Sequence, residues 1–134
     1  MIATIQLHSS SKYILYLLHS QDVHARAQED QTALHLASSY GHHDVVRILL
    51  SHGAHVDAVD ENSYTPLMFA AMGNHPHTVN ELLVHKANFT LTNINGDSAL
   101  KLAITEKAPL AQTVIENHML SLIKGISGKT VEGE

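Results

Sequence analysis

The chain has 134 residues, of which 44% are hydrophobic and 16% are charged, and its formal net charge is -5 when histidine is counted as neutral. This length and apolar content allow one ordinary domain with a buried core, whereas nucleic-acid binding would usually require a basic face. The absence of cysteine excludes disulfides and thiolate metal sites.

Residues 1–7 are apolar, but they lack the basic flank and the small-residue cleavage site of a signal peptide. No run in the chain approaches the roughly 18 apolar residues that span a bilayer. We therefore expect no membrane partner and a cytoplasmic location, with the nucleus as the alternative.

Three segments of the chain repeat one another at an interval of 33 residues: 30–37, 63–70 and 96–103. The pair Leu49–Leu50 recurs at the same interval as Leu82–Leu83. Such a period indicates a stack of similar units, each too small to bury its own apolar face. A stack offers a long, shallow surface and no deep pocket of its own, which favours binding over catalysis.

Each unit is predicted to contain two short helices, a turn between them and an extended finger. In the middle unit, Thr65 supplies a hydroxyl that can cap a helix start, and Pro66 is well tolerated at the first helical position. Apolar residues then recur every three to four positions, as on one face of a helix. The turn is expected at Gly73, one residue out of register with Gly41 in the preceding unit, which predicts a reshaped loop.

The second helix of the preceding unit ends near Gly53, where glycine can adopt the left-handed conformation that closes a helix. Lys86 stands at the same place one unit later, where a left-handed residue should cost about 1–2 kcal/mol. In the third unit, residues 115–124 continue as a helical pattern in place of a finger. A terminal unit needs a polar outer face, yet Val114, Ile115, Met119, Leu122 and Ile123 look apolar, so we interpret the chain as part of a longer stack or a larger protein.

With these positions assigned, the chain resembles the ankyrin repeat, whose period is 33 residues and whose signature reads T-P-L-H-x-A. Thr32–Ala37, Thr65–Leu67 and Ala99–Leu100 fall on the family's positions, and the resemblance covers roughly residues 2 to 115. It implies an all-α repeat solenoid of stacked helix-turn-helix units with extended β-turn fingers. The expected segments are a partial unit at 1–26, units at about 27–59, 60–92 and 93–124, and a flexible tail at 125–134.

The resemblance also implies a protein-binding module that is not an enzyme and that needs no cofactor and no metal. In the histidine position of the signature, His35 is kept, whereas Met68 and Lys101 replace it. The polar bracing that this histidine provides in the family is therefore expected to be absent from two units.

Family members make their contacts through the finger tips and the exposed end of each first helix. In this chain, those positions hold Glu29, Gln31, Ser39, Tyr40, Glu61, Asn62, Tyr64, Met72, Asn95, Asp97 and Glu106. None is Lys or Arg and four are acidic, so the expected partner is a basic or amphipathic segment of another protein, bound on the concave face. Tyr40 and Tyr64 are interpreted either as binding hot spots or as packing between neighbouring fingers.

Two further interpretations stay open. The chain could be a regulatory or scaffolding fragment of a larger enzyme, channel or adaptor whose active part lies elsewhere, and its uncapped ends predict self-association. Its twelve histidines also suggest a metal- or proton-responsive domain. We interpret most of them as repeat positions and single out His75 and His77 as the best candidates for a metal.

Overall fold

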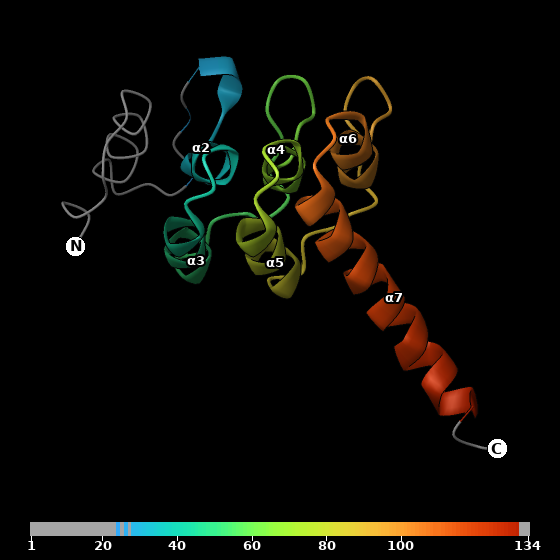
Figure 1. Cartoon of the computed structure of the whole chain (residues 1–134). Coiled ribbons are helices and arrows are strands. Elements are labelled where there is room, and N and C mark those ends of the chain that lie inside the picture. The colour runs from blue at the N-terminus through green and yellow to red at the C-terminus, as the bar shows by residue number, and fades with distance from the viewer. Residues whose placement is uncertain (1–23, 25, 27, 132–134) are drawn as a thin grey trace.

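A computed structural model describes residues 24, 26 and 28–131 of the chain (Figure 1). Its elements are η2 Gln28–Asp30, α2 Ala33–Ser39, α3 His43–Ser51, α4 Pro66–Met72, α5 Pro76–Val84, α6 Ala99–Thr105 and α7 Pro109–Val131. Apart from residues 24 and 26, the predicted partial unit at 1–26 lies outside the described residues. Within those residues, no helix is long and apolar enough to cross a membrane.

The helices form two rows, as Figure 1 shows. The first-helix row consists of α2, α4 and α6, and α4 packs against both of its neighbours in that row. The second-helix row consists of α3, α5 and α7, with α5 packed between the other two. Finger loops connect consecutive units at residues 54–64 and 87–97. The prediction of an all-helical repeat solenoid is confirmed.

Each helix of the first row begins at a hydroxyl residue in the same register: Thr32, Thr65 and Ser98. The hydroxyl oxygen accepts a hydrogen bond from the backbone N–H three residues later, at 3.2–3.3 Å. This bond satisfies a helical N–H that otherwise has no partner, and it fixes where the helix begins.

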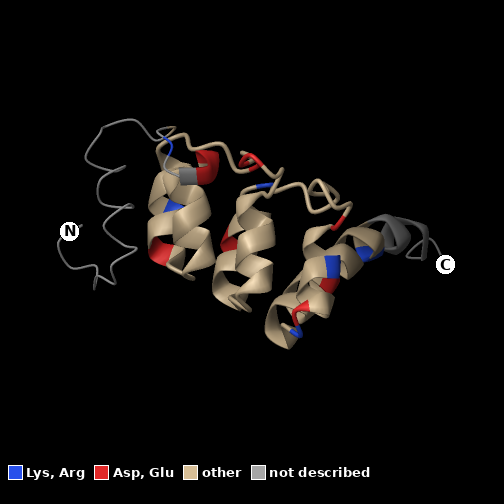
Figure 2. Cartoon of the chain, turned by 90° about the horizontal axis from the view of Figure 1, so that it is seen from above, with Lys and Arg blue, Asp and Glu red and all other residues tan. Residues whose placement is uncertain are grey.

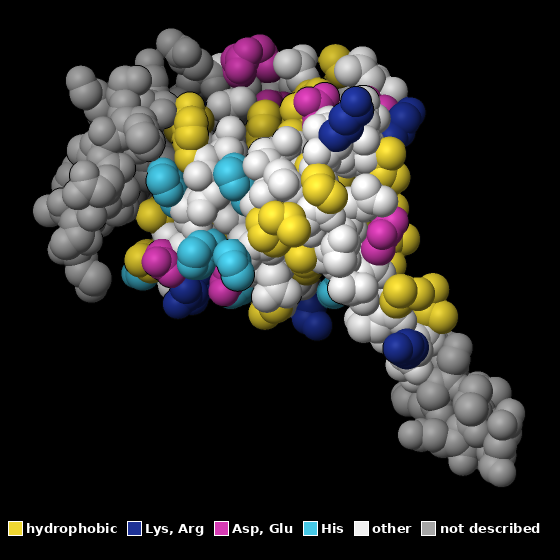
Figure 3. All heavy atoms as spheres, in the orientation of Figure 1, with side chains coloured by type: hydrophobic (Ala, Val, Ile, Leu, Met, Phe, Trp, Pro, Cys, Tyr) yellow, Lys and Arg dark blue, Asp and Glu magenta, His cyan; other side chains and the backbone are white. Residues whose placement is uncertain are grey.

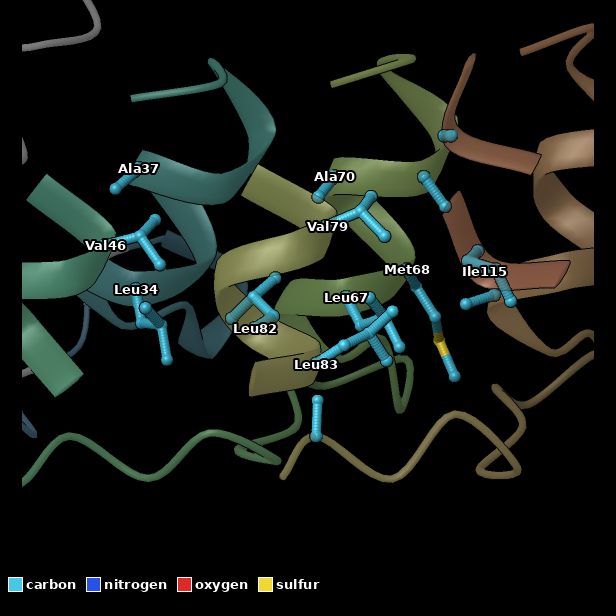
Figure 4. Packing of buried hydrophobic residues seen from close by; sticks show 14 of the residues in the cluster. Leu34, Ala37, Val46, Leu67, Met68, Ala70, Val79, Leu82, Leu83 and Ile115 are labelled. Carbon is cyan, nitrogen blue, oxygen red and sulfur yellow. The ribbon is translucent and has the colours of Figure 1, made fainter. Parts of the chain in front are cut away.

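The core lies between the two rows and between successive units (Figure 4). Leucines fill the space inside each helix pair, including Leu34 and Leu67, each about 1% exposed. Alanines occupy the places where helices of neighbouring units approach closely, and Ala70 and Ala71 of α4 are fully buried. The narrow apolar stripe read from the sequence is therefore the surface through which the units stack.

Three positions of the repeat take left-handed backbone conformations. Residues with positive φ at these positions are Asp30, Ser63 and Gly96 at the finger turn, Gly41, Asn74 and Lys107 between the helices, and Gly53 and Lys86 after the second helix; outside this pattern, Glu29 also has a positive φ. Each position is glycine in one described unit and another residue in the rest. The prediction that Lys86 is left-handed is confirmed, with φ at 71°.

The turn of the middle unit is not shifted, so that expectation is wrong. The left-handed residue there is Asn74, which is in register with Gly41, while Gly73 has an ordinary φ of -82°. Glycine is needed at 73 for space, because a Cβ would lie 2.5 Å from the ring of His75. That ring also lies against Gly41, and its Nε2 is 3.0 Å from the carbonyl oxygen of Ser39.

Asn74 has a second role, at the start of α7. Its Oδ1 accepts hydrogen bonds from the backbone N–H groups of Leu110 and Ala111, at 2.9 and 3.0 Å. Asparagine tolerates the left-handed conformation better than most residues. The backbone of this residue therefore closes the turn of its own unit, and its side chain caps the long helix of the next.

The last helix differs from its equivalents, α3 and α5, because it continues to Val131 instead of ending in a finger. The expected boundary at 124 does not coincide with a structural one, since residues 125–131 extend the same helix. Adding residues to an existing helix gains one hydrogen bond for each residue fixed. The glycines in this stretch therefore do not end it.

The outer face of α7 is polar where it lies over the stack. Gln112 and Glu116 stand in register with the buried Val79 and Leu83 of α5, and Gln112 donates a hydrogen bond to Glu116 at 3.2 Å. This pair gives the third unit the polar outer surface that a terminal repeat requires. The interpretation of 114–123 as an apolar exposed end holds only in part, because Ile115 is fully buried.

We predict that Lys86→Gly stabilises the chain by about 1 kcal/mol, because glycine removes the left-handed strain on an exposed lysine. Urea unfolding should show a higher midpoint with an unchanged slope.

Asn74→Gly is the matched control, since it also places glycine at a left-handed position. It should destabilise the chain by about 1–2 kcal/mol, because two N–H groups of α7 lose their acceptor. If both variants shifted the midpoint in the same direction, the separate roles assigned to the two residues would be wrong.

Candidate protein-binding surface

The candidate surface consists of the three finger tips and the C-terminal ends of the first-helix row, which lie at the opposite end of each helix from its finger. Of the predicted contact residues, six are exposed: Glu29, Tyr40, Glu61, Asn62, Asn95 and Glu106. The other five are half-buried: Gln31, Ser39, Tyr64, Met72 and Asp97. The predicted contact residues therefore lie along the row of fingers and at the helix ends, and they differ in how far they are exposed to solvent.

Backbone hydrogen bonds join each finger to the next. The N–H of Glu61 donates to the carbonyl oxygen of Glu29 at 3.1 Å, and the N–H of Ile94 donates to that of Asn62 at 3.2 Å. Since these bonds do not involve side chains, they fix the spacing of the tips whatever residues the tips carry.

Two buried polar side chains shape the tips, and the sequence analysis did not assign this role. Oδ1 of Asp60 accepts the backbone N–H groups of Asn62 and Tyr64 at 3.0 and 2.9 Å. Oδ1 of Asn93, one repeat later, accepts those of Asn95 and Asp97 at 2.9 and 3.0 Å. An acid or amide at one register just before the second and third tips was the signal available in the sequence.

His35 ties the first helix row to the second finger. Its Nδ1 accepts the backbone N–H of Thr32 at 3.1 Å, so the ring proton is on Nε2, which donates to the carbonyl oxygen of Tyr64 at 2.9 Å. The ring is fully buried. Burial lowers the pKa of His35 below its ordinary value of 6.5, and the Tyr64 carbonyl and Asp60 offset this only in part.

The expected loss of bracing at the other two signature positions holds for one unit and is partly wrong for the other. The sulfur of Met68 accepts the backbone N–H of Thr65 at 3.4 Å, so a weak form of the same cap remains. A thioether has no proton to donate, and the bond to the next finger is therefore lost. Lys101 instead pairs with Asp97, with 3.0 Å between Nζ and Oδ1.

The charges of the surface are predominantly acidic (Figure 2). Asp97 is neutralised by Lys101, whereas Glu29, Glu61 and Glu106 have no ion-pair partner among the residues that the structure describes. Sequence reasoning counted four equivalent acids, but side-chain pairing leaves three available to attract a basic partner.

The two tyrosines have different environments. Tyr64 is half-buried and stacks on Phe69, with ring centroids 5.2 Å apart and planes at 22°, so it packs against helix α4 of its own unit, whereas the packing interpretation placed it against a neighbouring finger. Tyr40 is 43% exposed at the end of α2, with its ring centroid 6.2 Å from that of His42. Only Tyr40 therefore presents much of its ring to a partner.

Histidines gather on the side of α2 and α3 in Figure 3. The rings of His43 and His77 approach to 5.5 Å between centroids. His75, singled out with His77 as a metal candidate, is packed between two glycines and bonded to a backbone carbonyl. Within the described part of the chain, no group of three or more potential ligands is arranged to hold a metal.

We predict that the chain loses stability as the pH falls below about 6.5, in part through His35. The lowered pKa of His35 in the folded chain means that the unfolded chain binds its proton first. The stabilisation is complete above the unfolded pKa and is lost as the pH falls through the folded one. Urea unfolding at several pH values should give a shallower pH dependence for His35→Gln than for the original chain.

His52→Gln is the control, because His52 is exposed and its removal leaves the caps of the first-helix row intact. If His35→Gln kept the full pH dependence of the original chain, buried His35 would not be its source.

Comparisons with known proteins agree with this architecture. A family model described as ankyrin repeats (3 copies) matches residues 1–93 and 54–122. The BCL-6 corepressor-like protein 1 of Mus musculus is 40% identical over 95 residues. The aligned stretch is 69% of this chain but only 5% of that protein, so the chain spans a small part of this relative's length.

Proposed function

Because the chain belongs to the ankyrin-repeat family, we propose that its finger tips and first-helix ends form a concave face that binds a basic or amphipathic segment of another protein. Repeats of this family are non-catalytic modules that generally mediate protein–protein interaction. The observation that supports the proposal is the exposure of Glu29 and Glu61 on two fingers that are hydrogen-bonded to each other, with Glu106 also exposed at the C-terminal end of α6.

The basic component of the partner follows from Glu29, Glu61 and Glu106. With no ion-pair partner among the described residues, these side chains can steer and pair with Lys or Arg. Each such pair contributes little at an exposed site, about 0.2–1 kcal/mol. Several must therefore act together, and they favour an extended segment that crosses more than one finger.

The apolar component follows from two exposed side chains on the same surface. Tyr40 is 43% exposed, and Ile94, at the tip of the third finger, is 65% exposed. A few residues, most often Trp, Tyr and Arg, supply most of the binding energy at protein interfaces, and burial of an exposed apolar side chain such as Ile94 adds to it. A segment with basic residues and one or two apolar anchors fits this combination better than a purely charged one.

The fixed fingers support binding by reducing its entropic cost. The turns are held by Asp60 and Asn93 and by bonds between fingers, so little ordering of the backbone is needed when a partner binds.

To test the proposal, we would titrate the chain with a fluorescent amphipathic peptide rich in lysine and leucine, and with a glutamate-for-lysine version of the same peptide. We expect binding of the basic peptide only, with affinity falling as salt rises. Glu61→Lys should weaken it about two- to fivefold, and Tyr40→Ala should weaken it further. Tyr64 is left unchanged, because it packs on Phe69 and its carbonyl holds His35.

Glu116→Lys is the matched control, since it makes the same charge change on the outer face of α7. A loss equal to that of Glu61→Lys would show that only net charge matters. Equal affinity for the basic and acidic peptides would contradict the proposed electrostatic basis.

Self-association is a second proposal, carried by the far half of α7. Leu120, Leu122 and Ile123 are each about half exposed there, and Figure 1 shows this half extending away from the stack. Burying these side chains against a second copy would remove apolar surface from water.

Sedimentation over a range of concentrations should detect a dimer, and Leu120→Glu with Ile123→Glu should abolish it. Leu110→Glu, which alters an exposed leucine at the other end of α7, should leave it unchanged. A chain that stays monomeric at all concentrations would contradict this proposal.

A further inference from the structure

The second and third fingers contain asparagines in the same register, Asn62 and Asn95, and both are exposed at the tips. The backbone around them is the same. The N–H of Asn62 donates to Oδ1 of Asp60 at 3.0 Å, and that of Asn95 donates to Oδ1 of Asn93 at 2.9 Å.

The residues that follow also have the same backbone conformation. Ser63 and Gly96 are left-handed, with φ values of 63° and 81°. Their N–H groups donate to the carbonyl oxygens of Asp60 and Asn93, at 3.0 and 2.9 Å. The two turns therefore differ chiefly in whether the residue after the asparagine carries a Cβ. Asn95 is the one asparagine of the chain that precedes glycine.

We propose that Asn95 is a site of spontaneous deamidation, through which the third finger gains a negative charge over time. The backbone nitrogen of Gly96 loses its proton to water and attacks Cγ of Asn95. A bond forms between that nitrogen and Cγ, and the bond from Cγ to Nδ2 breaks. The Nδ2 group leaves as ammonia and a five-membered succinimide remains. Water then opens this ring at either carbonyl to give aspartate or isoaspartate, with no change in oxidation state.

Three features of the finger favour the reaction at Asn95. Its side-chain amide has no hydrogen-bond partner among the described residues, so it is free to rotate toward the backbone. No atom lies within 4 Å of the place where a Cβ of Gly96 would be, so this side of the residue is open to water. Glycine also reaches the backbone conformations of ring closure without the steric cost that a side chain imposes. The hydrogen bond from the N–H of Gly96 to the carbonyl oxygen of Asn93 must break first, so the turn has to open before the reaction can proceed.

Asn62 provides an internal comparison, because Ser63 keeps a Cβ beside the attacking nitrogen in an otherwise matching turn. The side chain restricts the backbone and partly covers the nitrogen. We therefore expect Asn62 to deamidate several-fold more slowly than Asn95 in the same folded molecule.

The chemical consequence is local and follows whether or not a partner binds. Aspartate adds one charge to an acidic surface. Isoaspartate routes the main chain through a side-chain carbon, which displaces Gly96 and disrupts the turn held by Asn93. The effect on a partner rests on the proposed function: added charge would strengthen binding of a basic segment, and a displaced tip would weaken it.

The test is to incubate the full folded chain at neutral pH and follow both asparagines by peptide mapping with mass spectrometry, without any partner. We expect Asn95 to convert several-fold faster than Asn62. Gly96→Ser should slow Asn95 to the rate of Asn62, and Ser63→Gly should raise Asn62 to the rate of Asn95. Circular dichroism of each variant would establish that the fold is unchanged.

Equal rates at the two sites, or rates that do not follow the swapped residues, would overturn the proposal. So would an Asn95 that reacts in urea but stays intact in the folded chain, because the turn would then protect it. These readouts need no ligand, so they are independent of the outcome of the peptide-binding experiment.

Discussion

The structure depends on one constraint: no unit can bury its apolar stripe except against the next unit. Helices of seven to nine residues are too short to be stable alone, so neighbouring units must dock in register. Where the first-helix row packs, Ala37, Ala70 and Ala103 share one register and are all fully buried. A methyl group at each contact sets the distance between helices. A shift of one residue in any turn would rotate the next stripe out of contact, and the left-handed turns are therefore kept in register even where Lys86 bears the strain.

Signals that are local in the sequence predicted the fold well, but they could not predict the contacts between units. The hydroxyl caps and the strain at Lys86 each involve residues close in sequence, and the period of 33 residues can be counted directly along the chain. Gly73 was interpreted as the turn residue because glycine commonly marks a left-handed position. In the structure, Asn74 occupies the left-handed position, and the absence of a side chain at Gly73 leaves room for the ring of His75. His75 reaches a carbonyl of the preceding unit, a contact that the repeat pattern does not encode.

The candidate surface shows the same division between local and long-range information. The acidic positions could be counted from the sequence, but their pairing could not, and Lys101 removes Asp97 from the set available to a partner. The roles of Asp60 and Asn93 were also missed, although both stand at one register. The carboxylate of Asp60 is buried and accepts two backbone N–H groups, so it shapes the finger turn and does not contribute an exposed charge.

Asp60 and Asn93 allow the side chains at the finger tips to vary without changing the stability of the fold. Because Asp60 and Asn93 bind main-chain N–H groups, the side chains that follow them are not needed to shape the turn. Glu61 and Ile94 share one register and one backbone bond to the preceding finger, yet one is charged and the other apolar. Tyr64 is both a predicted contact residue and part of the packing of the stack, because its ring packs on Phe69 and its carbonyl oxygen accepts a hydrogen bond from His35. Under the proposed function, changes of side chains at the tips can therefore alter partner specificity without destabilising the stack, whereas a change at Tyr64 alters the stack itself.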